Sequence, residues 1–192
     1  MKKLVVFASG SGSDFQSIID NVEKGKINGK IVRLIASKEG IGAIDRANKH
    51  NIPVSVFAKA NYDNLNIMYD EIITLLKSDG VDLIILAGYL TILTHNIVDA
   101  FRNKIINIHP SLIPAYCGKG FYGMKVHEAV IANKEKFSGA TVHFVDEGAD
   151  TGKIIAQEKV QVFPSDTPQS LQQRVLELEH ILLPNTIANL CK

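Results

Sequence analysis

Cysteine is scarce in this sequence of 192 residues, and the two that occur form no recognisable site. Cys117 and Cys191 lie far apart and show neither a metal-ligand spacing nor a Cys-x-x-Cys redox pair. This usage disfavours a cysteine-based metal or redox centre. It predicts free thiols in a reducing compartment.

An excess of charge of either sign is also missing. The chain has 21 basic and 20 acidic residues, so it lacks the basic footprint of a protein that binds nucleic acid or a membrane surface. We therefore predict no nucleic-acid partner. An anionic ligand would have to be held by a local site.

Long hydrophobic runs are absent as well. The N-terminal stretch "MKKLVVFASGSGSD" has about five apolar residues before glycine and serine intervene. A signal peptide needs an apolar segment of roughly 7–15 residues, and a membrane span needs about 20. We expect a soluble, cytoplasmic protein with no membrane partner.

What the chain does contain is enough apolar sequence, 46%, for one continuous core. Short runs rich in β-branched residues predict strands at 4–8, 31–36, 54–57, 83–87 and 104–108. Segments with helical spacing lie between them, and the alternation is typical of parallel βαβ units in a doubly wound α/β sheet. No repeat, low-complexity tract or linker divides the chain, so we predict a single domain over residues 1–192.

The pattern changes near Gly139. "GATVHFV" and "KIIAQEKVQVF" are two extended runs in close succession, which predicts an antiparallel hairpin added to the parallel sheet. A helix from about Pro168 to Leu183 is expected to end the fold.

A glycine-rich loop, "FASGSGSDFQ", follows the first predicted strand. Phe15 stands where a dinucleotide fingerprint needs its third glycine, and the Gly-Lys-Ser/Thr ending of an NTP loop is missing. The loop could still hold one phosphate on the N–H groups around Gly12 and Ser13. Taken alone, the sequence favours the plainer alternative, a tight turn in which Ser13 or Asp14 caps the helix.

A histidine follows the fifth predicted strand, in "IINIHPSLIP". His109 should lie at the carboxyl edge of the sheet, where open α/β sheets bind ligands. Asn107 is two residues earlier, so both side chains point the same way in an extended segment. An amide and an imidazole at one point suit an oxyanion forming on a carbonyl carbon. The alternative is that both residues only bond nearby backbone groups.

The loop "VDEGADTG" follows the first strand of the hairpin. We interpret Asp146 and Glu147 as a solvated turn. If the loop folds toward the crevice, Asp150 could hold His109 as an imidazolium and accept a proton from it. His143 could face either the core or this site.

Two other chemistries are weakly supported. A serine hydrolase would need a G-x-S-x-G elbow, which is absent. His109, His143 and Asp150 are zinc-ligand types, but no H-E-x-x-H or C-x-x-C spacing accompanies them, so we predict no metal.

Five segments in one order give the chain a resemblance to a known family: "SGSGSDFQSIID", "LAGYLTIL", "NIHPSLIP", "TVHFVDEGADTG" and "RVLELEH". Over essentially its full length the sequence resembles the phosphoribosylglycinamide formyltransferases, folate-dependent enzymes of purine biosynthesis. The resemblance implies a Rossmann-like formyltransferase domain. It also implies transfer of a formyl group from 10-formyltetrahydrofolate to the amine of glycinamide ribonucleotide, with no metal and in a monomer or homodimer.

The resemblance further implies three groups of site residues. The catalytic trio would be Asn107, His109 and Asp150. The substrate would be bound by Gly12, Ser13 and Asp14 at its phosphate and by Glu179 at its glycinamide end. The pteridine pocket would be formed by Leu90, Thr91, Ile92 and Leu93, together with the backbone of Asp146, Glu147, Gly148 and Ala149. Phosphate binding would fall in the N-terminal half, about 1–100, and folate binding with catalysis in about 84–192. The Pro114 peptide bond would be cis.

Three positions depart from the family's commonest pattern. Asp14 replaces an asparagine in the glycine loop, and Thr91 stands where an arginine is frequent. An arginine that some members place before the long helix has no counterpart in "NYDNLNIMYD".

Related formyltransferases are the main rivals. Methionyl-tRNA formyltransferases add a C-terminal RNA-binding domain and formyltetrahydrofolate hydrolases add an N-terminal regulatory domain, and we expect neither here. A non-catalytic nucleotide-binding module would explain the glycine loop but not the trio.

Overall fold

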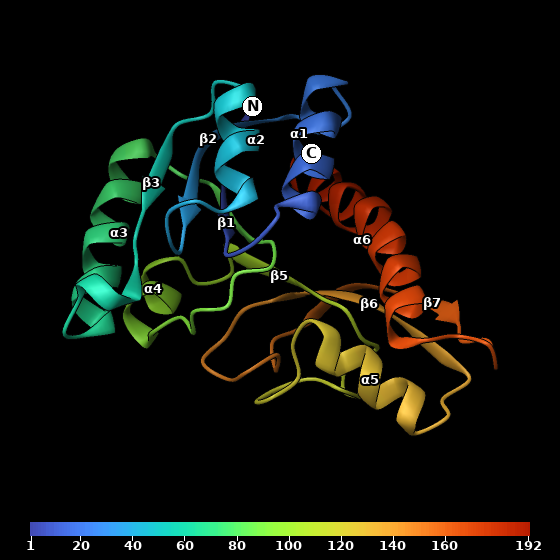
Figure 1. The fold of residues 1–192 in the computed structure, drawn as a ribbon. Coiled ribbons are helices and arrows are strands. Elements are labelled where there is room, and N and C mark those ends of the chain that lie inside the picture. Colours follow the sequence, from blue (N-terminus) through green and yellow to red (C-terminus); the bar gives the residue numbers. More distant parts are fainter.

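Seven strands form one sheet in the computed structural model, which describes residues 1–192 (Figure 1). The strand order is β3-β2-β1-β4-β5-β6-β7. Five strands are parallel, as predicted: β1 (Lys2–Ala8), β2 (Gly29–Ala36), β3 (Val54–Val56), β4 (Leu83–Leu86) and β5 (Ile105–His109). The predicted antiparallel hairpin is β6 (Phe137–Phe144) and β7 (Ile154–Gln161), with β6 paired to β5.

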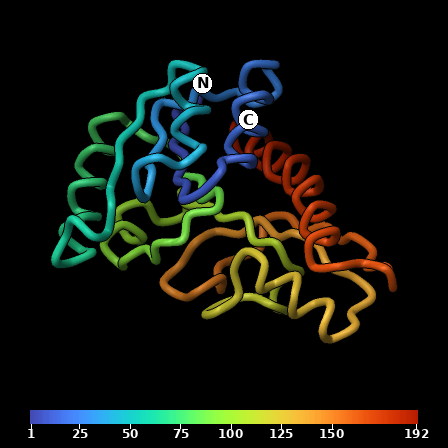
Figure 2. Tube along the Cα trace, in the orientation of Figure 1, coloured from blue at the N-terminus to red at the C-terminus, as the bar shows by residue number.

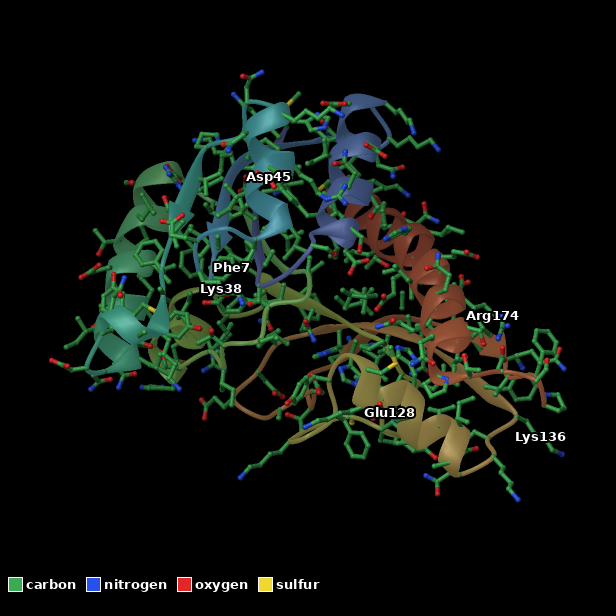
Figure 3. The ribbon with its side chains drawn as sticks, viewed as in Figure 1. Phe7, Lys38, Asp45, Glu128, Lys136 and Arg174 are labelled. Carbon is green, nitrogen blue, oxygen red and sulfur yellow. The ribbon has the colours of Figure 1, made fainter.

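Helices cover both faces of this sheet. Two clusters of buried residues fill the two interfaces, and β1 contributes alternate residues to each: Leu4 and Val6 to one, Val5 and Phe7 to the other. The first cluster includes residues of α1 (Ser13–Glu23), α2 (Gly42–Lys49), α5 (Met124–Ala132) and α6 (Pro168–Leu190), and the second those of α3 (Leu65–Asp79) and α4 (His95–Ala100). Phe7 lies in the interior, whereas Lys136 extends outward (Figure 3).

Local signals explain where the long helices begin and end. The side chain of Asn64 accepts a hydrogen bond from the Asn66 N–H ahead of α3, and Gly80 ends that helix with a φ of 68°. Thr167 and Ser170 form a capping box at the start of α6.

The predicted end of α6 at Leu183 is wrong, because the helix continues to Leu190 with Pro184 inside it. Proline removes one backbone hydrogen bond. Here Leu183, Pro184 and Ile187 are all buried, and their packing holds the last turns in place. The 3-10 turn Lys59–Asn61 was not predicted. No helix combines the length and apolar character that a membrane span requires.

The fold brings α1 and α6 side by side although they are near opposite ends of the sequence (Figure 2). At the carboxyl edge of the sheet, the loop after β1 also meets the loop after β4. Ser9 N–H donates to the Gly88 carbonyl at 3.1 Å, and Leu90 N–H donates to Ser9 Oγ at 3.0 Å. These contacts place the glycine loop beside the segment that follows β4.

Candidate active site

Asn107 and His109 lie at the carboxyl end of β5, between a parallel and an antiparallel neighbour. In the antiparallel ladder Asn107 is opposite His143 of β6, and its Nδ2 is 3.2 Å from His143 Nε2. The same Nδ2 donates to Asp150 Oδ1 at 3.5 Å. The amide is therefore held at the sheet edge by an imidazole and a carboxylate.

Asp150 reaches this edge from the β6–β7 loop, which folds back over β5. Its Oδ2 is 3.6 Å from His109 Nδ1 and accepts a hydrogen bond from Gly118 N–H at 2.9 Å. Its Oδ1 is 3.5 Å from His143 Nε2. The backbone of Asp150 is left-handed, with a φ of 59°, a conformation that aspartate tolerates better than most residues. Burial alone would raise the pKa of this carboxyl, but hydrogen bonds from His143 and Gly118, together with the charges of His109 and His143, hold the pKa below its ordinary value.

His109 is buried, with 5% of its surface exposed. Its Nε2 is 2.9 Å from the Tyr116 carbonyl oxygen. Because a carbonyl only accepts, Nε2 carries a hydrogen and donates it. Nδ1 is thereby left facing Asp150, at a distance longer than a hydrogen bond. The ring orientation is fixed by backbone on one side and a carboxylate on the other.

A second imidazole, His127 of α5, is also buried, with 2% of its surface exposed. Burial, and to a lesser extent the charge of His109, lower the pKa of His127 to about 4. His127 is therefore neutral at pH 7 and adds no positive charge to the site.

Two contributors to this geometry were not predicted, and for a third, His143, the sequence left the core and the site as alternatives. The Tyr116 carbonyl and the Gly118 N–H come from the loop after β5, and backbone groups leave no sequence signal. His143 could have been assigned from the hairpin register, which places it opposite Asn107.

The glycine loop turns sharply into α1. Gly12 has a φ of 73°, and a Cβ there would lie 2.8 Å from the Cα and Cβ of Ala43. Arg46 Nε donates to the Ser11 carbonyl at 2.9 Å and ties the loop to α2. The expectation that Ser13 or Asp14 caps the helix is wrong, because the left-handed Gly12 is the N-cap and no side chain bonds there. Both residues instead lie in the first helical turn.

The carboxyl of Asp14 points toward α6. Its Oδ1 is 3.7 Å from His180 Nε2, and neighbouring Glu179 is 7% exposed. Burial raises the pKa of Asp14 to about 6. Burial first, and then the charge of Asp14, raise the pKa of Glu179 well above its ordinary value. The structure thus brings the predicted phosphate loop and the predicted substrate acid together.

The predicted pteridine segment and the acidic loop are largely exposed. Leu90 and Ile92 are 62% and 79% exposed, Thr91 is half-buried with its carbonyl near the Tyr69 hydroxyl, and Leu93 packs on the second core cluster. Residues 146–149 are exposed, and Asp146 Oδ1 accepts hydrogen bonds from Gly148 N–H and Thr151 Oγ1. That turn agrees with the interpretation of Asp146. The Ile113–Pro114 bond is cis, as predicted.

Comparison with known proteins identifies relatives of this chain in both sequence and structure. The family described as "Formyl transferase" matches residues 2–187. A chloroplastic phosphoribosylglycinamide formyltransferase of Arabidopsis thaliana is 43% identical over 100% of this chain, which spans 66% of that relative's length. Phosphoribosylglycinamide formyltransferase of Bacillus subtilis is 38% identical over 99% of this chain and 95% of its own length.

A solved structure agrees with these sequence relatives. Glycinamide ribonucleotide transformylase 1 from Geobacillus kaustophilus superposes with a TM-score of 0.94 at 37% identity, covering 100% of both chains. With the trio gathered at the sheet edge and these matches across the whole length, the chain belongs to the formyl transferase family.

Proposed function

We propose that this chain transfers the formyl group of 10-formyltetrahydrofolate to the amine of glycinamide ribonucleotide, a step of purine biosynthesis. Family membership and the names of its relatives support the reaction class. The observation that carries the catalytic assignment is the convergence of Asn107, His109 and Asp150 at the carboxyl edge of the sheet. Both substrates are small molecules.

The proposed chemistry is direct transfer. The neutral substrate amine attacks the formyl carbon, a C–N bond forms, and the carbonyl oxygen becomes an oxyanion. Asn107 Nδ2 and the His109 imidazolium stabilise that oxyanion. His109 Nδ1 is 3.6 Å from Asp150 and so is not committed to it by a hydrogen bond, which leaves this N–H free to donate to the substrate.

Collapse of the intermediate breaks the bond between the formyl carbon and the folate nitrogen. The proton of the new ammonium moves to that leaving nitrogen, relayed by Asp150 and solvent. Asp150 suits this role because its low pKa keeps it ionised beside His109. The positive charge of the imidazolium is stabilised by the same carboxylate.

Substrate binding is proposed to follow the two halves of the chain. The ribonucleotide phosphate would bind Gly12, Ser13 and Asp14 in the half about 1–100, with Glu179 at the glycinamide end. Leu90 to Leu93 would form the pteridine wall, with backbone of Asp146 to Ala149, in the half about 84–192. Exposure of Leu90 and Ile92 supports a contact surface there. The free Cys117 and the free, buried Cys191 support a reducing, cytoplasmic location.

Single-turnover assays with both substrates test the trio. Asn107→Ala, His109→Ala and Asp150→Ala should each slow transfer by about 10²–10³, the cost of losing one oxyanion donor or its support. Asn133→Ala, at an exposed position after α5, is the matched control and should keep the wild-type rate. Near wild-type rates in all three trio variants would contradict the assignment.

Product analysis separates the alternatives in the same assay. Formyl glycinamide ribonucleotide is the expected product. Free formate alone would indicate a hydrolase, and binding without turnover would indicate a nucleotide-binding module. A formylated serine or cysteine trapped by mass spectrometry would contradict direct transfer.

A further inference from the structure

A cavity of about 440 Å³ lies where the loop after β5, the end of α5 and the start of β6 meet. None of the residues assigned to the catalytic trio or to either substrate lines it. Its volume is within the range of small-molecule sites, about 300–1,000 Å³. Each of the three segments contributes apolar wall, in the form of Leu112, Tyr116, Val130 and Phe137. A lining of this kind with a few polar groups is typical of a site for a ligand with an apolar body.

Ser138 adds a polar group to the lining that the protein itself leaves without a partner. The residue is 2% exposed, and its Oγ is shielded from solvent and makes no hydrogen bond. A buried hydroxyl without a partner is unfavourable and uncommon in folded proteins. A ligand in the cavity would supply the missing partner.

The open side of the cavity has an excess of positive charge. Lys134 and Lys136 line it, are both exposed, and form no ion pair in the protein. The one carboxylate of the lining, that of Glu135, already accepts a hydrogen bond from Tyr116 Oη at 2.8 Å. Lys136 extends into solvent (Figure 3), and its four-carbon stem allows the ammonium to fold back toward the opening. Two uncompensated ammonium groups beside an apolar cavity favour an anionic ligand.

Tyr116 connects the cavity to the candidate active site. It lines the cavity, and its carbonyl oxygen accepts the hydrogen bond from His109 Nε2 at 2.9 Å. Its backbone is left-handed, with a φ of 52°, so other contacts must hold it in place. Those contacts are the bond to Glu135 and the edge-to-face packing on Phe121, with ring centroids 5.9 Å apart. A ligand packed against Tyr116 adds to them and favours the conformation that orients His109.

We propose that this cavity binds a small amphiphilic anion, and that the bound ligand holds Tyr116 in the conformation that fixes the His109 ring. The ligand has an apolar body that carries a carboxylate, sulfonate or phosphate. The apolar wall packs on the body, the two lysines face the anionic group, and Ser138 forms a hydrogen bond with the ligand. The site is separate from the residues to which the proposed function assigns the substrates.

Fluorescence titration of the full chain with anilinonaphthalene sulfonate, an aromatic anion, tests the site. The wild type should bind it saturably, and a double variant with Lys134→Gln and Lys136→Gln should bind it about tenfold more weakly, the size of two solvent-exposed ion contacts. The matched control carries Lys24→Gln and Lys26→Gln, two exposed lysines with the same spacing at the end of α1, and should bind as the wild type does. Phenylnaphthylamine, which has the same ring system without the sulfonate, should bind the wild type about tenfold more weakly.

The second variant, Ser138→Ala, removes the buried hydroxyl. It should fold, because that hydroxyl has no partner to lose in the protein, and it should bind the sulfonate about threefold to tenfold more weakly. Hydrogen–deuterium exchange measures the effect on the loop. The amides of residues 115–118, among them the Gly118 N–H that bonds to Asp150, should exchange more slowly when the sulfonate saturates the wild type.

Three outcomes would overturn the site: no binding by the wild type, equal binding by the wild type and both variants, or displacement of the sulfonate by glycinamide ribonucleotide or a folate analogue. Displacement would show that the probe occupies the candidate active site, and would leave the proposed function intact. Saturable binding without slower exchange of residues 115–118 would overturn the role given to Tyr116.

Discussion

The burial of Asp14 predicts that replacing it with asparagine stabilises the fold at neutral pH. The pKa of this carboxyl is raised from 3.8 to about 6, so the folded chain resists ionising a group that ionises freely when unfolded. The contribution of this group to the free energy of unfolding is therefore greatest below pH 3.8, and that contribution is lost as the pH rises through about 6. Since one pKa unit corresponds to about 1.4 kcal/mol, the loss at pH 7 is about 3 kcal/mol.

Urea unfolding of the wild type and Asp14→Asn at several pH values checks this magnitude. The variant should have a free energy of unfolding about 3 kcal/mol higher at pH 7, and the two proteins should converge near pH 4. Glu177→Gln is the control, because an exposed substitution on α6 should change stability by less than about 0.5 kcal/mol. Equal stability of Asp14→Asn and wild type at pH 7, or a difference that is the same at both pH values, would refute the reasoning.

Three further outcomes are expected. His127→Gln should make the stability of the fold less dependent on pH on the acid side. The buried imidazole is neutral and stabilises the fold above its ordinary pKa of 6.5, and this contribution is lost as the pH falls toward about 4. Acid titration followed by circular dichroism would detect the difference. Gly12→Ala should weaken ribonucleotide binding and lower the melting temperature, because the new Cβ meets Ala43 at 2.8 Å in a left-handed turn; unchanged binding would contradict the close approach. Thr167→Ala should cost about 1 kcal/mol in urea unfolding through loss of its bond to the Ser170 N–H, whereas Thr167→Ser should retain most of it.

Much of the fold could be predicted because its signals are local. Strands β1 and β4 are continuous apolar runs, since parallel strands covered by helices are buried on both faces. The 3-10 turn Lys59–Asn61 was missed because a single turn leaves no periodicity to detect. The end of α6 was misplaced because proline ordinarily stops a helix, and only buried packing around Pro184 carries the helix past it.

The candidate site likewise has a part that could be predicted from the sequence and a part that could not. Two-residue spacing on a strand is enough to align Asn107 with His109. The position of Asp150 depends on a left-handed loop and on the Gly118 N–H that holds its carboxylate, and neither has a signature in the sequence. The side-chain direction of Asp14 was likewise undetermined, since a first-turn carboxylate can cap its own helix or turn toward a neighbour.

The sequence by itself determined the class of fold, the family and the edge of the sheet at which the site lies, because periodicity and the order of motifs are properties of the linear chain. Only the tertiary structure determined which side chains from segments distant in the sequence come into contact. It placed His143 against Asn107 through the hairpin register, and it buried the Asp14 carboxyl beside His180 by packing α1 on α6. Burial and neighbouring charge set the ionisation of a side chain, and both depend on contacts that exist only once the chain has folded.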